Sequence, residues 1–368
     1  MTHSKQPVRV AVVGAGNIAD DRHLPALRGM GERVEVVALV DVEESRARAL
    51  AQRWDVPHTF GDLAAMLAAE SPDLVVVCTP PGAHLDGVTT CLRAGAWVWC
   101  EKPPMLSLSE LDAVAELERD GGPYATYVFQ HRFGSGATRL RELVRTGELG
   151  RPLVAVCHTL WYRDPAYYEV PWRGRWATEG GGPTMGHGIH QMDLLLSLLG
   201  DWREVTAVTG TLERDVETED VAMAVVTFAS GAMATVVNSV LSPRETSYLR
   251  FDFTDATVEL QHVYGYGDDD WTWTPAPHVA DPDRVAGWRA TAGVPSGHAA
   301  QLRSLLDSFD RRERPQVSGV QGRETMELVT GIYRSAATGR SVARADLVPG
   351  SPHYDRLGGE LVTAGGAR

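Results

Sequence analysis

The sequence has few cysteines, no long apolar run and no excess of positive charge, and each absence excludes a class of protein. Four cysteines in 368 residues, without Cys-x-x-Cys spacing, argue against a disulfide scaffold and fit a reducing compartment. The sequence contains no run of about eighteen apolar residues, which a membrane-spanning helix would need. The opening MTHSKQPVRV does not resemble a signal peptide. The net charge of −13 argues against nucleic-acid and anionic-membrane partners. We therefore expect a soluble, cytoplasmic protein, and no motif predicts a metal site.

The length and the pattern of apolar runs predict two domains, residues 1–133 and 134–368, because 368 residues exceed what one core usually serves. In the first part, short apolar runs alternate with helix-like segments such as 43–54 and 108–119, which is typical of a parallel sheet covered on both faces. The expected strands there are 8–13, 34–40, 74–79, 96–100 and 124–129.

Beyond about residue 150, consecutive strand-like runs are joined by short turns, which predicts a mostly antiparallel sheet. Residues 264–298 are rich in Trp, Pro, Gly and Asp and are expected to form a long excursion outside the core. Residues 302–309 and 322–337 then return to a helical pattern. The expected strands are 152–160, 204–212, 221–228, 232–240, 248–254 and 257–261.

A glycine-rich segment directly follows the first expected strand and opens a helix. Such glycines permit a tight turn and let backbone N–H groups approach a pyrophosphate at the helix N-terminus. Asp41, at the end of the next strand, is placed to bind ribose hydroxyls and to repel a 2′-phosphate. The pattern predicts a dinucleotide, with NAD favoured and NADP possible, and its residues are Gly14, Ala15, Gly16, Asn17, Ile18 and Ala19.

Two further motifs carry groups suited to proton transfer. Glu101-Lys102-Pro103 follows the fourth expected strand, and ligands bind at the carboxyl ends of parallel strands. Alone this tripeptide would be a surface turn, but its position makes Lys102 a candidate to polarise a reacting oxygen. In the second part a glycine run leads to a helix carrying His190 and Asp193 three residues apart, on one face. A histidine with a nearby acid is a natural proton acceptor, but without the other motifs a core histidine and a helix-terminus carboxylate would be the preferred interpretation.

Taken together, these motifs resemble the Gfo/Idh/MocA oxidoreductases, the family of glucose–fructose oxidoreductase and inositol dehydrogenase. The resemblance runs over most of the chain and includes GAGNIA with His23, TPPGAH at 79–84, CEKP, GGG…GIHQMD and the tail ending SAATGRSVA. It implies an α/β protein: an N-terminal Rossmann-type domain and a C-terminal α+β domain whose open sheet supports a homodimer or homotetramer. It also implies that Lys102 and His190 are catalytic and that Thr79, Pro80, His84 and Glu101 lie along the cofactor.

The chain departs from this pattern at one position. Many members carry an acid four residues before the histidine, where this sequence has Gly186, and some sugar-nucleotide dehydrogenase relatives carry Asn. His187 could replace the acid or line the substrate pocket, and the second interpretation is favoured. The departure weakens an assignment as an inositol dehydrogenase and leaves the general dehydrogenase assignment intact.

An aromatic and arginine-rich segment, 161–176, precedes the glycine run. Aromatic faces pack on the C–H faces of sugar rings, and guanidinium groups bind hydroxyls or carboxylates. The alternative is that these rings close a domain interface. We expect substrate contacts from Arg163, Tyr168, Trp172, Arg173 and Trp176, with His187 and Asp193 beside them.

The resulting hypothesis is an NAD(P)-dependent dehydrogenase or ketoreductase that acts on a secondary hydroxyl or ketone of a sugar or polyol. His190 would move the hydroxyl proton and Lys102 would stabilise the developing alkoxide. Two alternatives remain open at this point: a redox-neutral glycosidase that retains NAD, and a dinucleotide-sensing regulator without turnover.

Overall fold

The computed structural model describes residues 6–359, and their internal contacts divide the chain into two compact units. The first comprises residues 6–105, 110–128 and 298–323, and the second comprises 106–109, 129–297 and 324–359. The domain boundary predicted from the sequence puts residues 298–323 in the second domain. The structure assigns this segment to the first unit, because Leu302, Leu305 and Leu306 pack into its hydrophobic core.

The first unit is built on a six-stranded, fully parallel sheet with the order β3-β2-β1-β4-β5-β6. The order reverses direction at β1 and β4, and in open parallel sheets such a switch point creates the crevice where ligands bind. All five expected strands are present, and β3 is an additional three-residue edge strand without an apolar run. The strands are β1 (Val8–Val13), β2 (Val34–Val40), β3 (His58–Phe60), β4 (Leu74–Val77), β5 (Trp97–Cys100) and β6 (Ala125–Tyr127).

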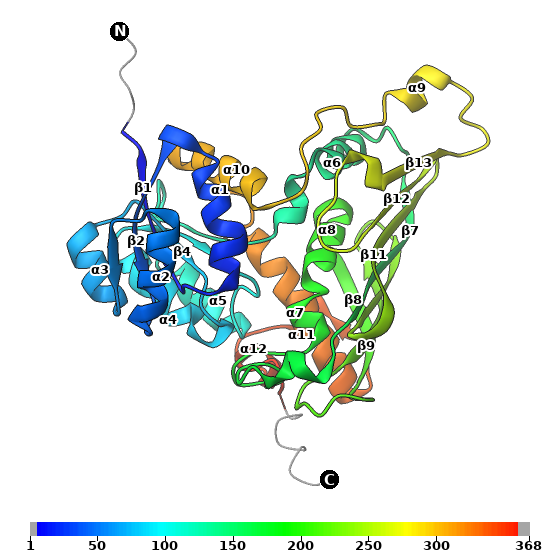
Figure 1. The fold of residues 1–368 in the computed structure, drawn as a ribbon. Helices are drawn as coiled ribbons and strands as arrows, with labels where there is room; N and C mark the ends of the chain where they lie inside the picture. Colours follow the sequence, from blue (N-terminus) through cyan, green and yellow to red (C-terminus); the bar gives the residue numbers. More distant parts are fainter. Residues whose placement is uncertain (1–5, 360–368) are drawn as a thin grey trace. The chain divides into compact units, whose positions relative to one another are not determined.

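Helices connect the parallel strands, as a parallel sheet requires. Residues 17–28 are helical and contain a π-helical turn, Ala19–His23, before α1 (Leu24–Arg28). α10 (His298–Arg311) returns from far along the sequence to lie beside α1 (Figure 1). The remaining helices are α2 (Glu44–Trp54), α3 (Leu63–Glu70), α4 (His84–Arg93) and α5 (Leu108–Ala115), with short 3-10 turns at Gly31–Arg33 and Pro81–Ala83.

The second unit contains an eight-stranded sheet with the order β13-β12-β11-β7-β10-β9-β8-β14, antiparallel except for the β7–β10 pair. Figure 1 shows α7 and α8 along one face of this sheet, and α7 contacts β9 and β10 while α8 contacts β7 and β11. Its strands are β7 (Pro152–Tyr162), β8 (Trp202–Gly210), β9 (Val221–Phe228), β10 (Met233–Ser239), β11 (Leu241–Phe253), β12 (Ala256–His262), β13 (Trp271–Pro275) and β14 (Val342–Ala343).

The helices of this unit are α6 (Ser135–Thr146), α7 (Pro183–Gly186), α8 (Ile189–Leu199), α9 (Pro282–Ala286), α11 (Val320–Thr338) and α12 (Pro352–Asp355). Short 3-10 turns lie at Gln130–Phe133, Pro165–Glu169, Asp268–Asp270 and Arg344–Asp346. α11 begins in the first unit and continues into the second. Within residues 6–359, no helix combines the length and apolarity needed to cross a bilayer.

The expectation that residues 264–298 lie outside the core is wrong in part. Trp271 and Trp273 point inward from β13, which pairs with β12, and Trp288 is buried as well. The alternation Trp-Thr-Trp-Thr has the two-residue period of a half-buried strand. The high Pro, Gly and Asp content of the neighbouring residues favoured an irregular segment in the prediction, although the alternation itself indicates a strand.

Candidate functional site

The glycine-rich turn after β1 is packed directly against the end of β4. Gly14 adopts φ +94°, and a Cβ there would lie 2.7 Å from the carbonyl carbon of Cys78. Both facts demand glycine. The Gly14 N–H donates to the Val40 carbonyl at 2.8 Å, which ties the turn to β2. At Gly16, by contrast, a Cβ would meet no protein atom within 4 Å. The protein therefore leaves space at Gly16 for a ligand to approach the backbone closely.

Asp41 lies beside this turn, at the carboxyl end of β2. Its Oδ2 accepts the Ala15 N–H at 2.8 Å, and its Oδ1 accepts the Glu43 N–H at 2.9 Å. The two backbone bonds fix the carboxylate, and each oxygen keeps a second lone pair for a ribose hydroxyl. Asn17 and Ile18 begin the helix whose N-terminal N–H groups follow the turn. The turn, Asp41 and the helix N-terminus together fit a dinucleotide.

Replacing Asp41 by Ser should narrow or reverse a preference for NAD over NADP. The loss removes both a charged acceptor for ribose hydroxyls and the repulsion of a 2′-phosphate, effects worth about 1–3 kcal/mol. Fluorescence titration with each reduced cofactor measures the ratio of dissociation constants. Glu43→Ser is the matched control, since Glu43 is an exposed acid two residues away. Equal affinity of the unaltered protein for both cofactors would contradict the role of Asp41.

Glu101, expected along the cofactor, is bonded to two histidines of the first unit. Its side chain is buried, and Oε1 accepts from Nε2 of His23 at 2.7 Å and from Nε2 of His298 at 3.2 Å. Oε2 accepts the backbone N–H of Lys102 at 3.1 Å. Burial alone would raise the pKa of Glu101, but the bonds from the two histidines hold this pKa well below its usual range. Burial lowers the pKa of His23.

These three side chains are also metal-ligand types. However, the two N···O separations are those of direct hydrogen bonds, so we interpret the cluster as a clamp on the residue preceding Lys102. The clamp joins a π-helical turn, the end of β5 and the start of α10. It fixes the backbone from which the Lys102 side chain projects. His298 could not be recognised from the sequence, since it lies 197 residues from Glu101.

His84 is likewise a fully buried residue. Its Nδ1 lies 2.9 Å from the Pro103 carbonyl oxygen, and its Nε2 lies 2.9 Å from that of Thr79. Burial lowers the pKa of His84. The ring therefore ties the segment after β4 to the segment after β5, whereas Thr79 is partly exposed and Pro80 is exposed. Of the three, only Thr79 and Pro80 have exposed surface, and the buried His84 ring packs beneath their segment.

Asp193, expected beside the substrate, forms an ion pair inside the second unit. Its carboxylate accepts two bonds of 2.6 Å from the Arg132 guanidinium and one of 3.0 Å from the Thr325 hydroxyl. The Asp193 side chain is 0% exposed. The partners that the structure shows for the Asp193 carboxylate are thus a buried guanidinium and a hydroxyl. The helical spacing of His190 and Asp193 is present, but Asp193 anchors α8 to residues 130–133.

The aromatic and arginine-rich segment forms a compact cluster around Tyr167. The guanidinium carbon of Arg173 lies 3.6 Å from the centroid of the Tyr167 ring, and that of Arg163 lies 5.4 Å from it. Arg163 Nε donates to Nε2 of His187 at 3.2 Å. The ring of Trp172 lies 5.0 Å from the Arg173 guanidinium, and the Tyr168 ring lies edge-on to Tyr167. The expected residues Arg163, Tyr168, Trp172, Arg173 and His187 are therefore brought together.

Trp176 lies elsewhere in the same unit. Its indole Nε1 donates to the Glu217 carbonyl at 2.9 Å, and its ring packs edge-on against Tyr333. Gly186 has a buried carboxylate beside it: a Cβ at this position would lie 3.5 Å from Oε1 of Glu179. Glu179 could not be predicted as a neighbour of Gly186 from the sequence, because only the fold brings the two together.

His190 is buried at the start of α8 among other rings. The ring of Tyr264 lies edge-on to His190 with centroids 6.1 Å apart, and it also contacts the ring of Trp161 at 6.2 Å. Trp161 in turn packs edge-on against His187 at 5.2 Å. The two histidines of the GHGIH segment thus belong to one cluster of rings. Tyr264 was missed because it falls in the stretch interpreted as an excursion.

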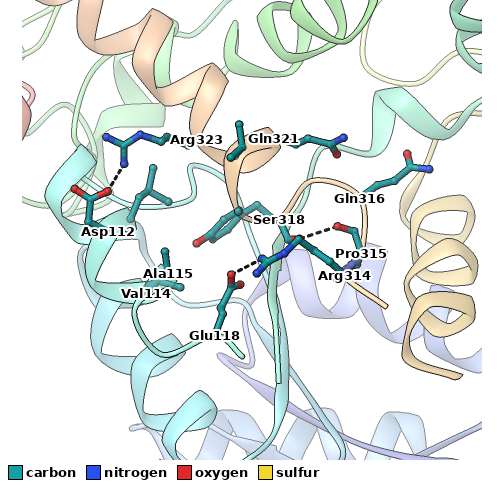
Figure 2. A pocket seen from close by; sticks show the side chains of 14 residues that line it. Asp112, Val114, Ala115, Glu118, Arg314, Pro315, Gln316, Ser318, Gln321 and Arg323 are labelled. Carbon is teal, nitrogen blue, oxygen red and sulfur yellow. Dashed lines mark hydrogen bonds and ion pairs between the residues drawn. The ribbon is translucent and has the colours of Figure 1, made fainter. Parts of the chain in front are cut away.

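A separate pocket of about 570 Å³ lies in the first unit between α5, residues 314–321 and the start of α11 (Figure 2). Figure 2 shows ion pairs on two sides of it, Asp112 with Arg323 and Glu118 with Arg314. None of the expected cofactor residues lines this pocket. It is therefore distinct from the glycine-rich turn.

Two family models match the chain in the order of its two units. Residues 8–127 match the oxidoreductase family with the NAD-binding Rossmann fold, and residues 137–259 match the GFO/IDH/MocA C-terminal domain. The chain belongs to the Gfo/Idh/MocA family. It is an oxidoreductase, and its first unit carries the family's NAD-binding domain.

Relatives of known activity cover nearly the whole length. D-glucoside 3-dehydrogenase of Escherichia coli (strain K12) is 28% identical over 364 residues, covering 92% of this chain and 98% of that protein. D-xylose 1-dehydrogenase (NADP(+)) 2 of Haloferax volcanii is 29% identical over 332 residues, covering 90% and 98%. The crystal structure of the WlbA dehydrogenase of Bordetella pertussis, in complex with NADH and UDP-GlcNAcA, is 25% identical with a TM-score of 0.80, covering 92% and 98%.

Proposed function

We propose that this protein oxidises a secondary hydroxyl of a sugar, polyol or sugar derivative, or reduces the matching ketone, with NAD preferred and NADP possible. The observation that carries the proposal is the cluster of rings and arginines around His187 and His190, which suits a carbohydrate ring. Relatives that act on D-glucosides and D-xylose, and a neighbour that binds NADH with a nucleotide sugar, support it.

His190 and Lys102 are the proposed catalytic pair. The bound nicotinamide supplies the hydride acceptor or donor. His190 takes the hydroxyl proton during oxidation and returns it during reduction, and the Lys102 ammonium stabilises the alkoxide that develops. The clamp on Glu101 holds the Lys102 backbone N–H, which fixes the point from which the Lys102 side chain starts.

Substrate recognition is assigned to Arg163, Tyr168, Trp172, Arg173 and His187. Arg163 donates to Nε2 of His187, so the lone pair of that nitrogen is already engaged. A nitrogen in this state is poorly suited to accept a substrate proton. His187 is therefore proposed to line the pocket rather than to replace the acid absent at Gly186. Asp193 and Trp176 have the structural partners described above.

His187→Ala should raise the Michaelis constant and leave turnover at saturating substrate nearly unchanged, since only uniform binding is lost. Steady-state kinetics with the best substrate measures both constants. Tyr162→Ala, which alters an exposed aromatic at the end of β7, serves as the control. A hundredfold lower turnover with an unchanged Michaelis constant would assign His187 a direct part in the chemistry.

The direct test is a screen of the purified protein against sugars, polyols and sugar acids, with absorbance of the reduced cofactor as the readout. A dehydrogenase gives net reduced cofactor with at least one substrate and loses it in Lys102→Ala. Release of an aglycone without net cofactor reduction, from protein that co-purifies with a dinucleotide, would instead indicate a redox-neutral glycosidase. Cofactor binding without turnover of any compound would indicate a sensing regulator.

We also propose that the protein forms a homodimer or homotetramer and that it is located in the cytoplasm. The sheet of the second unit carries exposed apolar side chains on adjacent strands, where Met233 pairs with Val154 and Met223 pairs with Val208. These residues are 46–66% exposed, and a patch of this kind is typical of an interface. Light scattering of the purified protein measures the oligomeric state. The cytoplasmic assignment rests on cysteine content, and all four cysteines are unpaired in the structure.

A further inference from the structure

The ring of His131 lies against the ring of His190 inside the second unit. Their centroids are 5.1 Å apart and their planes are inclined by 31°, which is a tilted stack. Phe129 lies edge-on to His190 at 6.5 Å and Tyr264 lies edge-on at 6.1 Å. Both histidines are at most 2% exposed. His131 is therefore part of the immediate surroundings of the proposed proton acceptor.

The hydrogen bonds of His131 define which of its nitrogens carries a proton. Its Nε2 lies 2.8 Å from the carbonyl oxygen of Tyr264, which can only accept, so Nε2 is the donor. Its Nδ1 lies 3.3 Å from the amide nitrogen of Gln191. The same amide nitrogen lies 3.1 Å from Nε2 of His262. An NH₂ group donates two bonds, so it satisfies both imidazoles when each offers a lone pair.

The arrangement is self-consistent only when both rings are neutral. Burial lowers the pKa of His262 to about 4, so this ring remains an acceptor at neutral pH. If Gln191 turned its oxygen to the rings, His131 would need protons on both nitrogens and would become a buried cation. Such a cation, stacked on His190, would oppose protonation of that ring.

We propose that His131 is a positioning residue for His190 and that the Gln191 amide holds His131 in its neutral form. The proposal rests on the proposed role of His190. A neutral ring packs against the base without a charge, so His190 can take up a proton as the hydroxyl is oxidised. Gln191 follows His190 directly in α8, so one helix carries both the proposed base and the group that sets its neighbour's charge.

The groups that face His131 come from α8, from β12 and from the segment that follows β12. Tyr264 and Tyr266 follow β12, and the Tyr266 hydroxyl donates to the His131 carbonyl oxygen. His262 comes from β12 itself, and His190 and Gln191 come from α8. The charged groups around this set are Arg132, Arg141, Asp193, Asp268 and Asp270, of which Arg132 and Asp193 are paired with each other.

The test compares Gln191→Glu with Gln191→Met in the full-length protein. A carboxylate at position 191 accepts a bond from a protonated Nδ1 and so favours the imidazolium form of His131. Met has similar length, but it neither donates a bond nor adds charge. NMR of protein labelled with ¹⁵N in its histidine rings reports the protonation of His131 directly, and this readout does not depend on turnover.

In the unaltered protein we expect His131 to carry a proton on Nε2 only, from pH 9 down to pH 6, where an unperturbed histidine would be largely protonated. In Gln191→Glu the ring should be doubly protonated near neutral pH. Oxidation should then fall about tenfold or more at pH 6.5 and recover toward pH 9, where His131 becomes neutral again. In Gln191→Met the oxidation rate should fall by less, and by the same factor at pH 6.5 and pH 9, because this substitution changes only the packing.

Two results would overturn the inference. One is a doubly protonated His131 in the unaltered protein at pH 7. The other is a Gln191→Glu profile that parallels the unaltered one while NMR shows His131 protonated. If no compound is turned over by the unaltered protein, the proposed function fails, and the NMR result still decides whether His131 is held neutral.

Discussion

Lys102→Ala should abolish most turnover while cofactor affinity stays close to that of the unaltered protein. The ammonium acts on the reacting oxygen, and a charge placed where an alkoxide develops is worth far more in the transition state than in the ground state. His190→Ala should lower turnover by about 10²–10⁴-fold, the usual contribution of a positioned acid or base. Stopped-flow measurement of the hydride-transfer step separates these losses from slower product release.

Two matched variants make this prediction specific. Lys102→Arg retains the charge but alters its shape and reach, and it should remain far less active than the unaltered enzyme. His84→Asn changes a neighbouring buried histidine that ties Thr79 to Pro103, so it should affect cofactor binding and stability more than the chemical step. Near-normal hydride transfer in both Lys102→Ala and His190→Ala would remove these residues from the mechanism.

Asp193→Ala should destabilise the second unit by about 3–5 kcal/mol, because it leaves the buried Arg132 charge without its partner. The side chains of the pair are 6% and 0% exposed, so bulk solvent does not reach the guanidinium that loses its partner. Urea unfolding followed by tryptophan fluorescence measures the change in the free energy of unfolding. The double variant Arg132→Met/Asp193→Leu should lose less stability than Asp193→Ala, since no unpaired charge remains.

Glu142→Ala is the control for this prediction. Glu142 pairs with Arg145 on α6 of the same unit, but both side chains are largely exposed, so their removal should hardly change the unfolding midpoint. If Asp193→Ala were as stable as this control, the pair would have no structural role. Asp193 would then return as a candidate for contact with the substrate.

Local patterns in the sequence determined the Rossmann-type domain and its cofactor. Buried parallel strands are short apolar runs, and a glycine turn is specified by residues adjacent in sequence, so both can be recognised without the fold. The five expected strands of the first unit are present, and the Asp41 carboxylate does lie at the turn, bonded to the Ala15 N–H. The motifs in their order also identified the family, which the comparisons confirm.

Only the tertiary structure decided which side chains meet. Glu101 bonds His298 across 197 positions, Arg132 bonds Asp193 across 61, and His131 bonds Tyr264 across 133. Periodicity reports the face of a helix or strand on which a residue lies, but it carries no information about the element packed against that face. For that reason Asp193 and Glu101 could be identified as important from the sequence, while their partners, and hence their actual roles, required the packed chain.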